Sequence, residues 1–264
     1  MSGAEQVSDV KDFKPLVAVQ NDRDIKFGTR VESVDVPAIL RQRCDWENNV
    51  FDELFCNSGV VPSQVVMISG EPGTGKTTIA LIIASALALQ GHNVIYNTTE
   101  EPFYQIKMTA ERLRIGGFDL GQESDVEALI RKCQIYRQHP YRQGKKTFVF
   151  HDSLQTFTSD SGAANTRVSE SSMLTLTDWA KKEFVNIIGL CQATKQGKFA
   201  GTQKMLHMAD TYAHIGIERK IDELLGTRRF ELRKNRFGPT GKMVWASYPA
   251  SGSEWEIRQT GTIG

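Results

Sequence analysis

The chain alternates between short apolar runs and longer segments whose apolar residues recur every three to four positions. The short runs predict buried strands at residues 64–69, 92–97, 147–151 and 185–191. The longer segments predict helices between them, at 76–90, 103–114, 124–132 and 169–184. Strands that alternate with helices indicate an α/β protein with a mostly parallel, twisted sheet that helices cover on both faces.

The last third of the chain has a different pattern. An apolar run at 213–217 is followed by two strand-like segments, 229–233 and 242–247, which Gly238-Pro239-Thr240-Gly241 connects. This arrangement predicts an antiparallel hairpin at the edge of the sheet. We therefore expect one main domain over 36–250, a polar segment at 1–35 that is flexible or docks on a neighbouring subunit, and a flexible tail at 251–264.

The composition limits the kinds of binding site and the cellular location that we expect. The 32 Lys and Arg residues nearly balance the 31 Asp and Glu residues, so a nucleic-acid site has to come from local clusters of cations. The four cysteines form no C-x-x-C pair, which argues against a zinc site and favours reduced thiols. An apolar signal core is missing, and the longest apolar run, 80–89, is too short to span a bilayer. We expect a cytoplasmic protein without a membrane partner.

The most specific motif follows the first predicted strand. It is a complete phosphate-binding loop, Gly70-Glu71-Pro72-Gly73-Thr74-Gly75-Lys76-Thr77, at the start of a predicted helix. Glycines let the backbone N–H groups surround phosphate oxygens, and the helix N-terminus adds partial positive charge. The motif predicts ATP and Mg²⁺ as cofactors, with Lys76 on the β- and γ-phosphates, Thr77 on the metal ion and Thr78 also at the nucleotide.

Three further predicted strands end in side chains that suit this chemistry, since ligands of open parallel sheets bind beyond the carboxyl ends of the strands. Glu100 follows the second strand and is a candidate for orienting the attacking water, although an acid there also complements a helix dipole. Asp152 ends the third and is a candidate Mg²⁺ ligand, with a turn-capping Asp as the alternative. Gln192 ends the fourth and could sense the γ-phosphate.

Candidate nucleic-acid contacts lie in the loops that follow these strands. Cations, glycines and one aromatic side chain are typical of a surface for single-stranded DNA. A solvated basic loop is the alternative. The candidate residues are Arg167, Lys195, Lys198, Phe199 and Lys204.

A second cluster of cations lies near the C-terminus, in residues 228–236. Lys234 and Arg236 are two positions apart at the end of the predicted strand, so they lie on the same face of it. We expect this pair to act on the nucleotide of a neighbouring subunit, because the chain's own ATP binds at another part of the domain. Solvated cations on an edge strand are the alternative.

These motifs together resemble one family. Residues 96–113 are similar to the Glu-Glu…Gln-Ile-Lys…Ala-Glu-Arg-Leu stretch of bacterial RadA/Sms recombination proteins, and 152–156 to their Asp-Ser-Ile-Gln-Thr. Residues 193–197 and 207–210 resemble their Val-Thr-Lys-Asp-Gly and His-Met-Val-Asp segments. The most specific match is to their Lys-Asn-Arg-Phe-Gly signature, which is Lys234-Asn235-Arg236-Phe237-Gly238 here.

The resemblance implies a RecA-like P-loop ATPase core that forms a homo-oligomer on single-stranded DNA, as a hexameric ring or a filament. It also implies a role in branch migration or unwinding, alongside other recombination or replication proteins, in a bacterium or a phage. By this resemblance, Lys76 and Thr77 take the nucleotide and Mg²⁺ roles, Glu100 a catalytic role and Asp152 a metal role. The two loops take the DNA role, and Lys234 and Arg236 act across the subunit interface. The zinc module and Lon-like domain of RadA are not found in this sequence.

Two alternatives remain open at this point. Gln192 and the Lys-x-Arg pair are also similar to DnaB-type replicative helicases, which suggests a helicase core without its N-terminal module. The other alternative is a KaiC-like regulatory or scaffold ATPase that binds no DNA, which a net charge of +1 permits.

Overall fold

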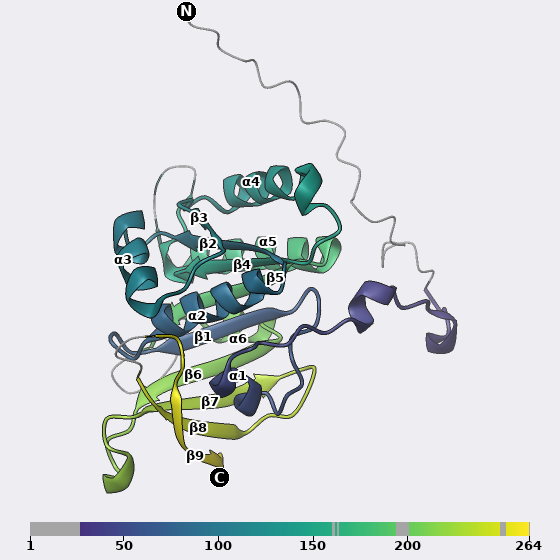
Figure 1. Cartoon of the computed structure of the whole chain (residues 1–264). Coiled ribbons are helices and arrows are strands. Elements are labelled where there is room, and N and C mark those ends of the chain that lie inside the picture. Colours follow the sequence, from purple (N-terminus) through teal and green to yellow (C-terminus); the bar gives the residue numbers. More distant parts are fainter. Residues whose placement is uncertain (1–26, 160–161, 163, 194–200, 249–251, 264) are drawn as a thin grey trace, which may run out of the picture.

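The computed structural model describes residues 27–159, 162, 164–193, 201–248 and 252–263. Its centre is a nine-stranded sheet in the order β3-β2-β4-β5-β1-β6-β7-β8-β9 (Figure 1). The strands are β1 Val65–Gly70, β2 Asn93–Thr98, β3 Asp119–Gly121, β4 Thr147–Asp152, β5 Asn186–Gln192, β6 Thr211–Ile217, β7 Arg228–Asn235, β8 Lys242–Ser247 and β9 Glu256–Thr262. The predicted α/β architecture with a mostly parallel sheet is confirmed.

Helices cover both faces of this sheet. They are α1 Asn49–Leu54, α2 Lys76–Leu89, α3 Phe103–Leu113, α4 Val126–Gln138, α5 Thr166–Glu183 and α6 Gln203–Met208. Apolar side chains of α1, α2 and α3 share one buried cluster with one face of the sheet, and those of α4, α5 and α6 share a second cluster with the other face. Figure 1 shows α1 over the antiparallel strands and α2 over the parallel ones.

Parallel pairing extends from β3 to β6, and this half contains the continuous apolar runs. The strands β1, β2 and β4 are buried along their whole length, as expected of strands covered on both faces. Gly70 at the end of β1 is level with Ile215 on β6 and with Gln192 on β5. The carboxyl ends of these strands therefore meet at one edge of the sheet, where the phosphate loop begins.

Antiparallel pairing joins β6 to β7, β7 to β8 and β8 to β9. The predicted hairpin of β7 and β8 is confirmed, but β8 is not the edge strand, because β9 pairs with it along its length. The prediction of a flexible tail over 251–264 is therefore wrong for residues 256–262. Trp255, which precedes β9, is 1% exposed and packs edge-on against Phe230 and Tyr248, so burial of this ring holds the segment on the sheet.

Other differences from the predicted elements are local. Helix α4 is longer than predicted because Asp125 caps its first turn and the chain continues helically to Gln138, shortly before Pro140. The short elements α1, α6 and β3 were not predicted, since three to six residues give too weak a period. The four cysteines are free thiols.

Candidate functional site

The phosphate loop has the backbone that its glycines predict. Gly73 and Gly75 have φ values of 77° and 94°, in the left-handed region that other residues adopt only with strain. A Cβ atom on Gly70 would lie 2.6 Å from the carbonyl oxygen of Ile215. Helix α2 begins directly after Gly75, and within the described chain no side chain caps it, so its first amides remain for an anion.

Lys76 lies over this loop. Its Nζ atom donates to the carbonyl oxygens of Gly70, at 2.9 Å, and Glu71, at 3.2 Å. Burial lowers the pKa of the Lys76 ammonium, while the nearby carboxylates of Asp152 and Glu100 oppose that shift. A half-buried cation beside the uncapped N-terminus of α2 fits the charge of a triphosphate.

Asp152 lies next to the loop at the end of β4. Thr77 Oγ1 and Tyr96 Oη each donate to its Oδ2 atom at 2.9 Å. Burial raises the pKa of this carboxyl group, and the hydrogen bond from Thr77 opposes the shift. A carboxylate and a hydroxyl oxygen in contact are the hard ligands that Mg²⁺ prefers, so Thr77 and Asp152 fit the predicted metal role.

Glu100 is exposed beyond the end of β2, on the same edge of the sheet. Its Oε1 atom accepts hydrogen bonds from Ser153 Oγ and, at 3.4 Å, from Gln192 Nε2. The structure thus brings two predicted residues, Glu100 and Gln192, into direct contact, and Ser153, which directly follows Asp152, donates to the same oxygen of Glu100. Burial, together with the charges of Asp152 and Glu100, raises the pKa of the adjacent Glu101.

Three residues at this site were not predicted from the sequence. Tyr96 donates to Asp152, and Ser153 donates to Glu100. Arg228 donates to two carbonyl oxygens of the phosphate loop, Gly73 at 3.2 Å and Thr74 at 3.3 Å. Ser153 could have been suspected from its place beside Asp152. No sequence signal connects Tyr96 or Arg228 to the loop, because strand pairing brings them there.

The other predicted residues are more dispersed. The hydroxyl of Thr78 hydrogen bonds with Tyr248 at 2.5 Å. Arg167 is exposed at the start of α5, and Lys204, on α6, forms an ion pair with Glu170 of α5 at 3.7 Å. Both remain predicted DNA contacts. The other three predicted contacts, Lys195, Lys198 and Phe199, lie outside the described residues.

Lys234 and Arg236 lie at the opposite end of the sheet from the phosphate loop. Lys234 on β7 pairs with Tyr212 near the start of β6, whereas the loop is level with the end of β6. On β1 these levels correspond to Met67 and Gly70, which are three residue steps, or about 10 Å, apart along the strand. The pair therefore lies at the end of the sheet away from the phosphate loop, and its action on a neighbour stays a prediction.

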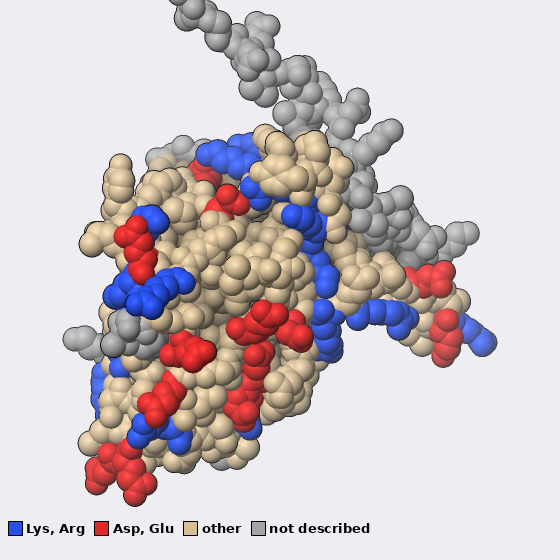
Figure 2. All heavy atoms as spheres, in the orientation of Figure 1, with Lys and Arg blue, Asp and Glu red and all other residues tan. Residues whose placement is uncertain are grey.

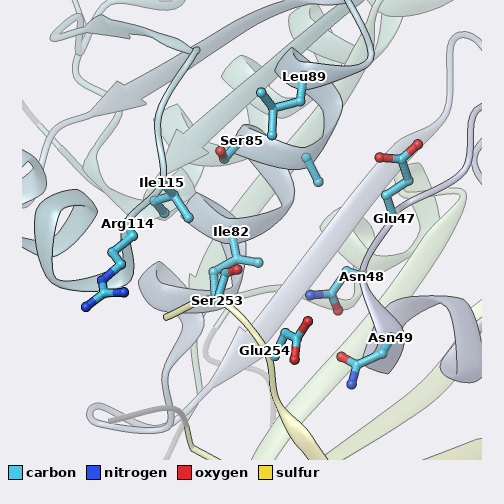
Figure 3. A pocket seen from close by; sticks show the side chains of 11 residues that line it. Glu47, Asn48, Asn49, Ile82, Ser85, Leu89, Arg114, Ile115, Ser253 and Glu254 are labelled. Atoms are coloured by element: carbon cyan, nitrogen blue, oxygen red, sulfur yellow. The ribbon is translucent and has the colours of Figure 1, made fainter. Parts of the chain in front are cut away.

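A cavity of about 460 Å³ lies elsewhere, beside the second half of α2 (Figure 3). Its lining includes Ile82, Ser85 and Leu89 of α2, Arg114 after α3, and Glu254 before β9. None of the predicted site residues lines it.

In the described parts of the chain, no helix is long and apolar enough to cross a bilayer.

Comparison with known proteins adds evidence from outside this chain. DNA repair protein RadA of Listeria monocytogenes is 35% identical over 190 residues, which is 70% of this chain and 39% of that protein. RadA of Bacillus subtilis is 31% identical over 218 residues, or 81% of this chain and 44% of that protein. The chain contains a RadA-type ATPase core of the RecA family. It spans less than half the length of these two relatives.

Two other comparisons agree with this core. The family model described as "ATPase: KaiC" matches residues 49–129, which include the phosphate loop and Glu100. A KaiC-like protein of Pyrococcus horikoshii has a TM-score of 0.67 at 19% identity, over 83% of this chain and 99% of that one. A second solved structure, also an ATPase domain, has a TM-score of 0.66 at 16% identity, over 81% of this chain and 90% of that one. At these identities the structural matches support the fold alone.

Proposed function

We propose that this RadA-type core hydrolyses ATP with Mg²⁺ and uses the energy to move along single-stranded DNA, in branch migration or unwinding. The observation that carries the proposal is the edge of the sheet where the phosphate loop, the Thr77–Asp152 pair and Glu100 meet. The similarity to RadA, over 70% of the chain or more, favours DNA as the second ligand.

Each residue at this edge has a distinct task in the proposal. The amides of the loop and Lys76 would hold the phosphates, and Thr77 and Asp152 would hold Mg²⁺, directly or through water. Bound ATP supplies the phosphoryl group whose transfer to water releases the energy. Glu100 would orient that water, since Ser153 and Gln192 both donate to its Oε1 atom and fix the carboxylate.

A homo-oligomer is part of the proposal. Arg236 lies too far along the strand to reach its own phosphate loop, so its charge is useful to hydrolysis only at the loop of a neighbouring copy. Contacts between the phosphate-loop end of one copy and the opposite end of the next are heterologous, and such contacts close into rings or extend as filaments. We propose a ring, with six subunits as the expected number.

The DNA surface is proposed from the exposed starts of α5 and α6. Both signs of charge occur on the face shown in Figure 2, so whole-protein attraction to DNA is weak and local cations have to supply it. Among the residues that the structure describes, Arg167 and Lys204 are the candidates for contacts with DNA. The match to the KaiC model supports a second candidate function, a regulatory ATPase whose nucleotide controls assembly without DNA.

The experiment that separates these functions measures ATP turnover and binding of oligo-dT across a salt series. The motor predicts faster turnover with oligo-dT and an affinity that falls steeply with salt. Lys204→Gln should reduce the slope of log K against log salt by about 0.7, the value for one phosphate contact on a single strand. Lys132→Gln is the matched control, because Lys132, on α4, is likewise an exposed lysine paired with a glutamate, Glu123.

The outcomes are distinct. Turnover that ignores oligo-dT, with no salt-dependent binding, would overturn the motor and favour the regulatory ATPase. An equal slope change in Lys132→Gln and Lys204→Gln would place the DNA surface elsewhere.

A further inference from the structure

The segment His207-Met208-Ala209-Asp210 matches a motif of the RadA family, yet none of its residues lies at the phosphate loop. The segment includes the end of α6 and leads into β6. In the structure it contacts both Lys234 and Arg236, although some 25 residues separate it from them in the sequence. The two motifs are therefore parts of one cluster at the amino end of the parallel strands.

Lys234 closes the end of α6. Its Nζ atom donates to the carbonyl oxygens of Leu206 at 2.7 Å, His207 at 3.3 Å and Ala209 at 2.6 Å. An ammonium group has three N–H donors, so these carbonyls can use all of them. The last carbonyls of a helix lack partners within the helix and favour a cation. Ala209 is fully buried, so moving Lys234 away would leave its carbonyl without this donor.

Arg236 is held differently. Its Nη1 atom donates to Asp210 Oδ1 at 3.1 Å and its Nη2 atom to the carbonyl oxygen of His207 at 2.8 Å. The Arg236 side chain is 50% exposed, whereas that of Asp210 is 2% exposed. A guanidinium carries five N–H donors, so these two contacts leave others directed away from the cluster. Arg236 is thus oriented by the buried Asp210 carboxylate and by the His207 carbonyl oxygen, while part of it faces outward.

Asp210 is itself fixed from the other side. Its Oδ2 atom accepts hydrogen bonds from the backbone N–H of Val65 at 2.9 Å and from Lys181 Nζ at 2.5 Å. Val65 begins β1, the strand that leads to the phosphate loop. The two carboxylate oxygens therefore divide their contacts, with Oδ2 bound to the scaffold and Oδ1 bound to Arg236.

We infer that Asp210 is a positioning residue, which orients Arg236 toward the nucleotide of the neighbouring copy, while Lys234 anchors the end of α6 beside it. The inference rests on the proposed function, in which Arg236 acts across the subunit interface. It divides the predicted Lys-x-Arg pair into one anchor and one outward-facing cation. A misplacement of about 1 Å in a catalytic group can cost about a hundredfold in rate, so the contact at Oδ1 matters for turnover.

The test uses Asp210→Asn in the full chain. An amide oxygen can still accept from Val65 and Lys181, while the amide nitrogen facing Arg236 removes that contact. We expect the maximal ATP turnover to fall about tenfold to a hundredfold, with ATP affinity unchanged. Lys181→Met is the matched control, because it also removes a partner of Asp210 but leaves Arg236 paired. Its turnover should stay within about twofold of the unmodified protein.

Mixing experiments give a readout that a loss of stability would not produce. Lys76→Ala has a defective loop but an intact Arg236, so mixing it with Arg236→Ala should restore some turnover if Arg236 acts on a neighbour. Asp210→Asn should behave as Arg236→Ala does, recovering turnover with Lys76→Ala and gaining none with Arg236→Ala. Lys234→Met should lower the thermal stability more than Arg236→Ala does, because it removes the donor to three carbonyl oxygens at the end of α6.

The outcomes distinguish the positioning role of Asp210 from the proposed action of Arg236 on a neighbouring copy, on which that role rests. If Arg236→Ala fails to recover turnover with Lys76→Ala despite proven mixing, action across the interface is refuted. If that mixture recovers but Asp210→Asn retains full turnover, or fails to recover with Lys76→Ala, the positioning role alone is refuted. Should Asp210→Asn not fold, the same comparisons apply to Asp210→Glu, which keeps the charge but displaces the carboxylate by one methylene.

Discussion

Replacing Tyr96 with Phe removes one hydroxyl from the proposed metal site and little else. Tyr96 is fully buried on β2, and its ring stacks near Phe150 at 6.0 Å, a contact that Phe can keep. Burial, followed by the charge of Asp152, raises the pKa of Tyr96 well above its usual range, so the phenol stays protonated and donates. The change therefore deletes one of the hydrogen bonds that stabilise the Asp152 carboxylate.

The expected magnitude follows from the energy of that bond. A hydrogen bond to a charged group contributes about 1.5–3 kcal/mol, which equals about one to two pKa units. Thr77 still donates to the same oxygen, so we expect the lower end, about one unit. The hydrogen bond favours the ionised form, so its loss raises the pKa of Asp152 further. The carboxyl group then stays protonated to a higher pH, and Mg²⁺ binding requires it ionised.

The assay is the pH dependence of ATP turnover at saturating nucleotide. Tyr96→Phe should shift the acidic limb of the profile upward by about one pH unit, with a smaller effect above neutral pH. Excess Mg²⁺ should partly reverse the shift, since metal binding competes with the proton. Tyr212→Phe is the control, because the Tyr212 hydroxyl bonds to Ser69 at 2.8 Å in the same sheet and does not touch Asp152. An unchanged acidic limb in Tyr96→Phe would refute the reasoning.

Two predictions concern stability. Burial alone raises the pKa of Glu218, but hydrogen bonds from Trp245 and Arg229 lower it to about 2. The ionised Glu218 therefore stabilises the folded protein fully above about pH 4.3. This contribution to the free energy of unfolding is lost as the pH falls toward 2. Glu218→Gln should lower the free energy of unfolding at neutral pH by about 3 kcal/mol, measured by urea titration. The same change should flatten the pH dependence of that free energy in this window. An unchanged pH dependence would contradict this prediction. Trp255→Ala should cost about 3–5 kcal/mol, because the buried ring holds the segment before β9. The control Ile263→Ala, at a residue 41% exposed, should change little, and equal melting temperatures for both variants would refute the role of Trp255.

The sequence predicted the nucleotide loop because the loop is a local structure. The glycines and Lys76 act within eight consecutive residues, between a strand and a helix that their own periods reveal. Glu100, Asp152 and Gln192 were predicted almost as directly, since the carboxyl ends of parallel strands meet at one edge. For these residues, knowing the order of strands and helices was enough.

The second layer of contacts could not be predicted in this way. Tyr96 reaches Asp152 because β2 and β4 are neighbours with Thr98 level with Asp152. That register depends on packing between strands about 50 residues apart. Arg228 contacts the phosphate loop for a similar reason, because β6 lies between β7 and β1 in the sheet.

The composition of the last residues was misleading about their structure. Gly, Ser and Thr at 251–264 predict a mobile tail, but β8 offers an open edge and the core offers a place for Trp255, so the segment becomes β9. A local pattern cannot indicate that such an edge and pocket exist elsewhere in the fold.

The amino-acid sequence by itself therefore determined the nucleotide chemistry and the class of fold, because both depend on contiguous residues and on periodic burial. Only the tertiary structure decided which side chains orient that chemistry: Tyr96 on Asp152, Ser153 on Glu100, and Asp210 with Arg236. Those contacts depend on the order and register of strands, which packing of the whole sheet selects.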